Sequence, residues 1–216
     1  MRVKICGLSR PCDIDFVNEA RPDFCGFVFA KSRRQVTVGQ AEALRGKLSE
    51  EIIPVGVFVN EPLENVVWLL KNSVISWPQL HGAEDENYIA ELRLRTDANF
   101  PIIRAVRVDS AEDLLAAQKC GADFLLLDHG AGGTGKTFDW NILNVLNSKK
   151  GNDAENAGPF PLKPFFLAGG ICLENVDEAM KLVPYALDLS SGVETNGVKD
   201  RNKILEIVRR IKNDRI

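Results

Sequence analysis

Short hydrophobic runs alternate along the chain with longer segments in which apolar residues recur every three or four positions. A short continuous apolar run is typical of a strand buried on both faces, whereas the longer period is typical of an amphipathic helix. The first run, at residues 3–6, precedes a segment whose Ile14, Val17 and Ala20 share one helical face. Ser9 is the predicted N-cap of that helix, because its hydroxyl can accept a hydrogen bond from the first turn.

Continued to the end of the chain, this alternation predicts strands at residues 3–6, 24–29, 54–59, 74–80, 102–108, 124–128, 165–168 and 185–189. The helices after the second to the eighth strand are predicted at residues 38–48, 63–70, 84–94, 110–119, 141–146, 174–182 and 203–211. Ser110 is a predicted helix cap, and Pro78 is unusual inside a central strand because it lacks an N–H. Residues 149–161 have no periodicity and read as a surface loop.

Eight such units in 216 residues fit an α/β protein with a single-domain (β/α)8 barrel, the TIM barrel, over residues 1–216. An open doubly wound sheet would use the same local signals, so the count of eight is what favours the barrel. The apolar fraction of 45% is enough for a sizeable core.

Composition excludes several classes of protein. A net charge of −3 argues against a nucleic-acid-binding role, which normally needs a clustered basic excess. No apolar run reaches the roughly 18 residues of a membrane span, and the N-terminus lacks a signal-peptide pattern, so we predict a cytoplasmic protein that binds no membrane. Five scattered cysteines without a C-x-x-C pair, and two histidines, indicate neither a disulfide framework nor a metal site.

The strand predicted at residues 124–128 carries Asp128 into a glycine-rich stretch, which has two interpretations. In a barrel, Asp128 would be a strand-tip carboxylate that meets a substrate. Alternatively, Gly130–Thr137 matches the P-loop pattern G-x-x-x-x-G-K-[ST] and would make this a nucleotide-binding protein with Lys136 on the phosphates. A P-loop normally follows an early strand and opens a long helix, so the late position of this run favours the barrel interpretation.

Catalytic groups of a barrel lie at the C-terminal ends of its strands. The glycine-rich breaks after the seventh and eighth strands predict a phosphate site built from backbone N–H groups, although ordinary tight turns use the same residues. Cys6 would act as a thiolate only if a helix N-terminus or Lys4 lowered its pKa, and is otherwise a small buried hydrophobe. Arg34 is either a fork for a carboxylate or part of a solvated charge run, and Asp128 could merely cap its glycine turn.

Several segments together resemble the phosphoribosylanthranilate isomerase family of tryptophan biosynthesis. The likeness keeps its order over nearly the whole chain, which makes it more specific than any one motif. Ala30 departs from the family, which often has an extra proline there, and the 149–161 loop is peculiar to this sequence. The resemblance rests on Lys4–Gly7, Gly26–Phe29 with Lys31–Arg34, Gly56–Asn60, Gln79–Gly82, Gly132–Trp140 and Asp188–Glu194.

The resemblance implies a barrel enzyme that needs no metal or cofactor and isomerises phosphoribosylanthranilate by an Amadori rearrangement. It implies that Cys6 is the general base, Asp128 the general acid and Arg34 the holder of the anthranilate carboxylate. In this interpretation Lys136 and Thr137 would be parts of a mobile lid over the substrate, since their run is glycine-rich and polar. We expect a monomer or homodimer whose partner is this small phosphosugar-anthranilate substrate. The resemblance further assigns Gln79, His81 and Asp188 to the substrate site, Asp188 in a supporting role, and Gly169, Gly170, Ser190, Ser191 and Gly192 to the phosphate.

Overall fold

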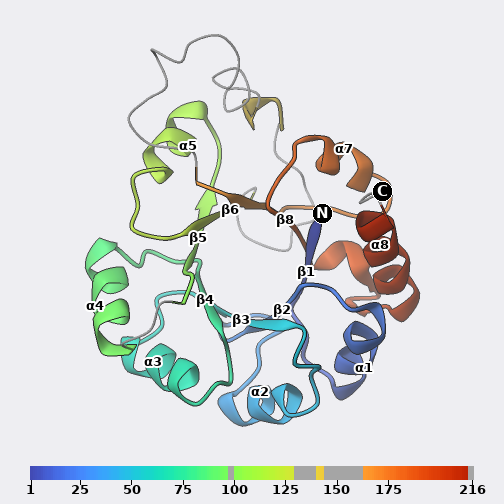
Figure 1. Ribbon diagram of the computed structural model, residues 1–216, viewed down its shortest axis with the longest axis horizontal. Helices are drawn as coiled ribbons and strands as arrows, with labels where there is room; N and C mark the ends of the chain where they lie inside the picture. The colour runs from blue at the N-terminus through green and yellow to red at the C-terminus, as the bar shows by residue number, and fades with distance from the viewer. Residues whose placement is uncertain (97–99, 129–139, 144–162, 214–216) are drawn as a thin grey trace.

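The computed structural model describes residues 1–96, 100–128, 140–143 and 163–213 (Figure 1). The proposed P-loop or lid at residues 130–137 and the loop at residues 149–161 lie outside these ranges, as does the end of the helix predicted at residues 141–146. In the described part, that helix is a short 3₁₀ segment, η1 (Trp140–Leu143).

Eight parallel strands form a closed barrel in which each strand pairs with the next and β8 returns to pair with β1. Helices surround this barrel on its outside (Figure 1), which confirms the predicted (β/α)8 architecture. The strands are β1 (Arg2–Cys6), β2 (Phe24–Val28), β3 (Ile53–Phe58), β4 (Trp77–Leu80), β5 (Ile103–Arg107), β6 (Phe124–Asp128), β7 (Phe165–Leu167) and β8 (Ala186–Leu189). The helices are α1 (Pro11–Ala20), α2 (Val38–Arg45), α3 (Leu63–Lys71), α4 (Glu86–Thr96), α5 (Ala111–Ala117), α7 (Val176–Lys181) and α8 (Arg201–Asn213).

Two local predictions were wrong and one is confirmed. The N-cap position of α1 is Arg10 rather than Ser9, because the Asp13 carboxylate accepts the N–H groups of both residues. The fourth strand begins at Trp77 instead of residue 74. The predicted cap of α5 is confirmed, since the Ser110 hydroxyl accepts the N–H of Asp113.

The chain after β8 forms elements too short for a hydrophobic period to reveal. A 3₁₀ turn, η2 (Ser191–Val193), leads into an antiparallel hairpin of β9 (Glu194–Thr195) and β10 (Val198–Lys199). The hairpin brings Glu194 and Lys199 beside the loops that follow β2 and β8, as their contacts with Arg34 and Ser190 show.

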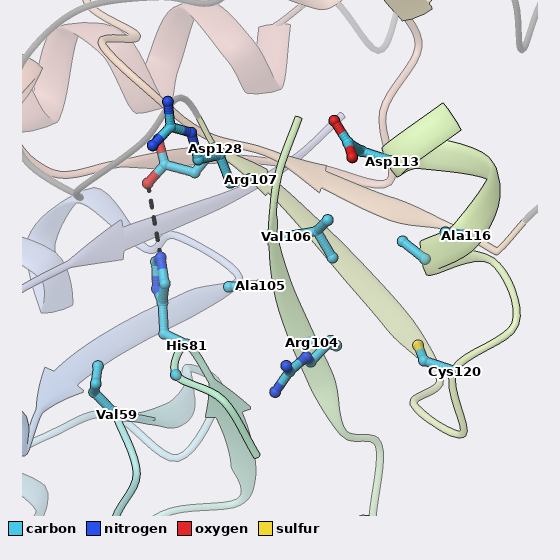
Figure 2. Close-up of a pocket in the computed structure, with 12 residues that line it drawn as sticks. Val59, His81, Arg104, Ala105, Val106, Arg107, Asp113, Ala116, Cys120 and Asp128 are labelled. Atoms are coloured by element: carbon cyan, nitrogen blue, oxygen red, sulfur yellow. Dashed lines mark ion pairs between the residues drawn. The ribbon is translucent and has the colours of Figure 1, made fainter. Parts of the chain in front are cut away.

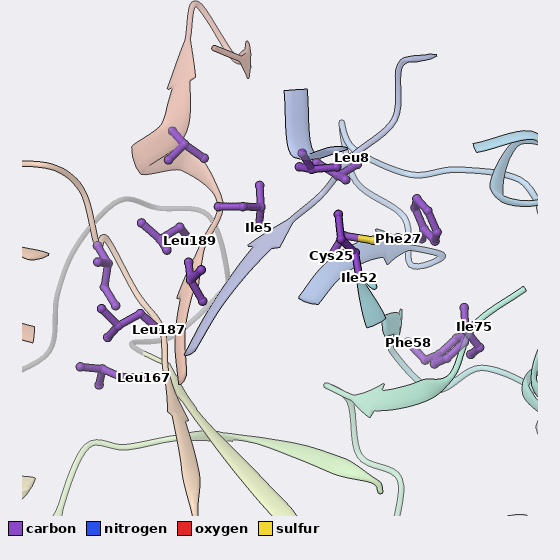
Figure 3. Close-up of a cluster of buried hydrophobic side chains, with 14 of the residues drawn as sticks. Ile5, Leu8, Cys25, Phe27, Ile52, Phe58, Ile75, Leu167, Leu187 and Leu189 are labelled. Carbon is purple, nitrogen blue, oxygen red and sulfur yellow. The ribbon is translucent and has the colours of Figure 1, made fainter. Parts of the chain in front are cut away.

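Alternation along each strand divides the core into two layers. Outward residues such as Ile5, Phe27 and Leu187 pack beneath the helices, and Figure 3 shows part of this layer. Inside the barrel, aromatic rings with centroids 4.5–6.4 Å apart fill the N-terminal half and leave the other end for polar groups. These rings belong to Phe24, Trp77, Phe124, Phe166 and Tyr185.

A helix that spans a bilayer needs about 20 predominantly apolar residues. Within the described ranges, the helices are all too short or too polar to span a membrane.

Candidate active site

The polar centre of the barrel begins with a lysine inside β1. The Lys4 side chain is fully buried, and its ammonium donates to Gln79 Oε1 at 2.8 Å and to Asp188 Oδ1 at 3.0 Å. Gln79 comes from β4 and Asp188 from β8, so three strands meet at this charge. A buried ammonium is tolerated only when paired and hydrogen-bonded in this way.

Cys6 lies at the end of β1, two residues after Lys4 and on the same face of the strand. Its thiol occupies the space beside Gly26, where an added Cβ would come within 2.7 Å of Sγ. Burial raises the pKa of the thiol, the Lys4 and Lys199 ammonium groups lower it, and Asp188 raises it again. The balance is a raised pKa, so the free protein holds a protonated thiol at neutral pH.

Asp128 ends β6, and His81 follows β4 directly. Figure 2 shows these two side chains pointing toward each other, with His81 Nε2 4.0 Å from Asp128 Oδ2. Burial lowers the pKa of His81 and outweighs the attraction of Asp128, which raises it, so the imidazole is neutral at neutral pH. Gln79 Nε2 lies 3.2 Å from His81 Nδ1 and joins this pair to the lysine centre.

A cavity of about 720 Å³ opens beside His81 and Asp128. Its volume is in the range that proteins use to enclose a small organic ligand. Arg104 and Arg107 line the same cavity from β5, with Ala105 between them (Figure 2), and are ion-paired with Glu84 and Asp109.

A second, much smaller pocket of about 40 Å³ lies between the loops after β7 and β8, and Asp128 reaches it. Gly169 and Gly170 have φ of 86° and 65°, a backbone conformation that favours glycine. At Gly192 an added Cβ would lie 1.9 Å from the carbonyl oxygen of Ile171, so the two loops touch through bare backbone. The pocket is lined by Asp128, Ala168, Gly169, Gly170, Ile171, Asp188, Ser190, Ser191 and Gly192.

Arg34 follows β2, and one edge of its guanidinium binds Glu194 of β9. Nε donates to Oε1 at 2.7 Å and Nη2 to Oε2 at 3.0 Å. The same carboxylate accepts from Lys199 at 2.7 Å and from Arg33 at 2.6 Å. Arg34 is therefore fixed by the protein along the Nε–Nη2 edge of its guanidinium.

Lys199 extends this cluster to Cys6. Its ammonium donates to the Ser190 carbonyl at 2.9 Å, and the Ser190 hydroxyl donates to the Cys6 carbonyl at 3.1 Å. Arg34, the small glycine-lined pocket and Cys6 are therefore joined by one hydrogen-bonded network whose centre is Glu194.

We expect Glu194→Gln to weaken the fold in a pH-dependent way. Burial raises the pKa of Glu194, but hydrogen bonds from Arg34 and Lys199 outweigh it and hold the pKa below 4.5. The carboxylate therefore stabilises the fold fully above pH 4.5, and its contribution is lost as the pH falls below 4.5 toward the folded-state pKa. At pH 7 the variant should lose about 3 kcal/mol in the free energy of unfolding.

Urea unfolding of both proteins between pH 3 and pH 7 measures this difference. Exposed Glu178→Gln, which removes only a surface ion pair with Lys181, is the matched control and should change the free energy of unfolding little. A loss at Glu194 that stays constant down to pH 3 would contradict the assignment.

The sequence was compared with known proteins. The family model for N-(5'-phosphoribosyl)anthranilate isomerase matches residues 3–210. The chain belongs to the phosphoribosylanthranilate isomerase family. The isomerase of Endomicrobium trichonymphae is 45% identical over 213 residues, which cover 96% of each chain.

Solved structures of the family agree with this assignment. The Thermus thermophilus isomerase has a TM-score of 0.81 at 31% identity and full coverage of both chains. A second isomerase, solved with reduced 1-(o-carboxyphenylamino)-1-deoxyribulose 5-phosphate, has a TM-score of 0.79 at 30% identity over 99% of each chain. Membership of this family leaves the P-loop interpretation of Gly130–Thr137 without support.

The structure places the site residues predicted from the sequence at one end of the barrel, at or just after strand C-termini. Sequence reasoning missed two participants, Glu194 and Lys199, and considered Lys4 only as a neighbour of the thiol. Lys4 does interrupt an otherwise apolar run, which signals an inward charge. Glu194 and Lys199 lie in a short hairpin, which carries no comparable signal.

Proposed function

We propose that residues 1–216 act as one domain that catalyses the Amadori rearrangement of N-(5'-phosphoribosyl)anthranilate to 1-(2-carboxyphenylamino)-1-deoxyribulose 5-phosphate. One observation carries the proposal beyond family membership: an acid, a base and an anion pocket converge at one barrel mouth. Asp128 lines the pocket with Ser190, and the Ser190 hydroxyl bonds the carbonyl of Cys6.

Asp128 acts as the general acid in this proposal. Its carboxyl group delivers a proton to the ring oxygen of the ribose, and the C1–O bond breaks to give an open-chain iminium at C1. Asp128 is left as a carboxylate, beside the Nε2 of a neutral His81. The positive iminium makes the neighbouring C2–H bond acidic.

Cys6 acts as the general base at C2. Its thiolate removes the C2 proton, and the bonding electrons move toward the iminium nitrogen to give an enolamine. C1 then takes up the proton held by the Cys6 thiol and the C2 hydroxyl gives one to the Asp128 carboxylate, which yields the ketone and restores both groups with no change in composition. The iminium also favours the thiolate, because a cation within the site offsets the burial that raises the pKa of Cys6.

The two anionic ends of the substrate orient it between these groups. Backbone N–H groups of the glycine turns and of Ser190–Gly192 would hold the phosphate, as glycine-rich loops commonly do. The Nη1 side of Arg34 would hold the anthranilate carboxylate, and His81 would line the sugar site with Gln79 behind it. Asp188 supports the site through its ion pair with Lys4.

Gly192→Ala should raise KM for phosphoribosylanthranilate at least about tenfold, the scale of one lost charge-assisted hydrogen bond. The added Cβ would overlap the Ile171 carbonyl oxygen, so the loops after β7 and β8 must move apart. Steady-state kinetics measure the change. Gly39→Ala is the control, since a Cβ there meets nothing within 4 Å, and an unchanged KM in Gly192→Ala would contradict the phosphate assignment.

Conversion of phosphoribosylanthranilate, followed as loss of anthranilate-type fluorescence in a metal-chelated buffer, tests the proposed function. Turnover with the expected product supports it, and absence of turnover in a folded preparation overturns it. Assembly as a monomer or homodimer stays a prediction, which sedimentation equilibrium of the same preparation would measure.

A further inference from the structure

Lys4 is a buried charged residue that takes no direct part in the proposed reaction. Its ammonium has three N–H donors and no acceptor. Two of these donors bind Gln79 Oε1 and Asp188 Oδ1, and Cys6 lies two residues further along the same face of β1. Burying a lysine side chain completely is costly in free energy, so its hydrogen bonds and ion pair must offset that cost.

The Lys4 contact fixes the orientation of the Gln79 amide. Only the carbonyl oxygen of an amide can accept from an ammonium, so Oε1 must face Lys4 and the NH₂ group must face the other way. That NH₂ group lies 3.2 Å from His81 Nδ1. Because an amide NH₂ only donates, Nδ1 must be the acceptor.

A neutral imidazole that accepts at Nδ1 carries its proton on Nε2. Nε2 is the atom that faces Asp128, at 4.0 Å from Oδ2. The N–H of His81 therefore points toward the carboxyl group that donates the proton in the proposed reaction. When Asp128 becomes a carboxylate, this N–H can move into hydrogen-bonding distance and donate to it. The donor is already oriented toward the charge that forms, and so stabilises it.

Burial and the charged groups around His81 together set the pKa of its imidazole. Burial lowers its pKa, Lys4 of β1 lowers it further, and Asp128 of β6, Asp188 of β8 and Glu84 raise it. The result is a pKa below 6.5, so the imidazole is uncharged at neutral pH. Lys4 thus favours the neutral ring whose proton position it also sets.

We propose that Lys4 is a positioning residue that links the base to the acid: it lies on the same face of β1 as Cys6 and, through Gln79, holds His81 as the Nε2–H tautomer facing Asp128. The catalytic consequence rests on the proposed function, whereas the tautomer does not. The link runs from β1 through β4 to β6.

Nitrogen NMR of histidine-labelled protein tests the tautomer directly. The chain has two histidines, so His81→Gln assigns the signals of position 81. At pH 7.5 we expect an unprotonated Nδ1 and a protonated Nε2 in the unsubstituted protein. A protonated Nδ1, in either a neutral ring or an imidazolium, would overturn the proposal.

Two variants test the link itself. In Gln79→Glu the carboxylate still accepts from Lys4 but cannot donate to Nδ1, so the proton should move to Nδ1, and kcat should fall at least about tenfold. In Lys4→Met the amide is released, and the Nε2–H form should lose its dominance. Gln79→Glu that keeps the Nε2–H signal pattern would overturn the proposal, even if Lys4→Met does not fold.

Lys199→Met is the matched control, because it removes the other buried lysine, which contacts Glu194 and Ser190 instead of Gln79. The tautomer of His81 should be unchanged in this variant, and a change would show that any buried charge sets it, against the proposal. Failure of the proposed function is seen separately, as absent turnover in the unsubstituted protein, and leaves the NMR result intact.

Discussion

Replacing Cys6 by serine is expected to lower kcat for phosphoribosylanthranilate at least about 10²-fold, the scale of lost general-base catalysis. The hydroxyl fits the space beside Gly26 that the thiol occupies, so the pocket keeps its shape and KM should change little. A serine hydroxyl has a far higher pKa than a thiol, so the iminium that favours the Cys6 thiolate does not suffice to make a serine alkoxide.

Initial rates over a range of substrate concentrations separate kcat from KM in this experiment. Cys12→Ser on α1 is the matched control, since Cys12 is a partly exposed thiol outside the site, and its kcat should stay at the original value. A Cys6→Ser protein that turns over at a near-normal rate would remove the thiol from the reaction.

A loss of kcat at least about 10²-fold is also expected for Asp128→Asn, again with little change in KM. An amide has the shape of the carboxyl group but cannot release a proton to the ribose ring oxygen. His81 does not replace it as the acid, because burial lowers the pKa of the imidazole and keeps it neutral. Ring opening should therefore become the slow step.

Single-turnover kinetics with excess enzyme report that step without interference from product release. Asp177→Asn is the control because Asp177 lies on α7 in a surface ion pair with Arg210, and its rate should match that of the unsubstituted protein. If Asp128→Asn opened the ring at the normal rate, another group would have to be the acid.

The fold could be predicted from the sequence because a parallel barrel strand is buried on both faces and therefore reads as an uninterrupted apolar run. The errors lay where side-chain chemistry at an element's end decides the boundary. Asp13 accepts the N–H groups of Ser9 and Arg10 from inside the first turn, and no pattern of hydrophobicity distinguishes an N-cap at Arg10 from one at Ser9.

The candidate site could be predicted in part, since strand ends and glycine-rich breaks are visible along the chain. The partners of Arg34 could not, because Glu194 lies 160 positions away in a hairpin of two-residue strands. The contacts of the Gln79 amide with Lys4 and His81 could not be predicted either, because Lys4 lies on another strand 75 positions away.

The ion pair between Lys4 and Asp188 joins positions 184 residues apart, near the two ends of the chain. During synthesis on the ribosome, the first strand emerges long before the last, so the nascent protein carries an ammonium group without its carboxylate. Burying that charge early would be costly, which favours closing the barrel only after translation has delivered β8. The lysine that positions the polar groups inside the folded barrel therefore also favours late closure of that barrel.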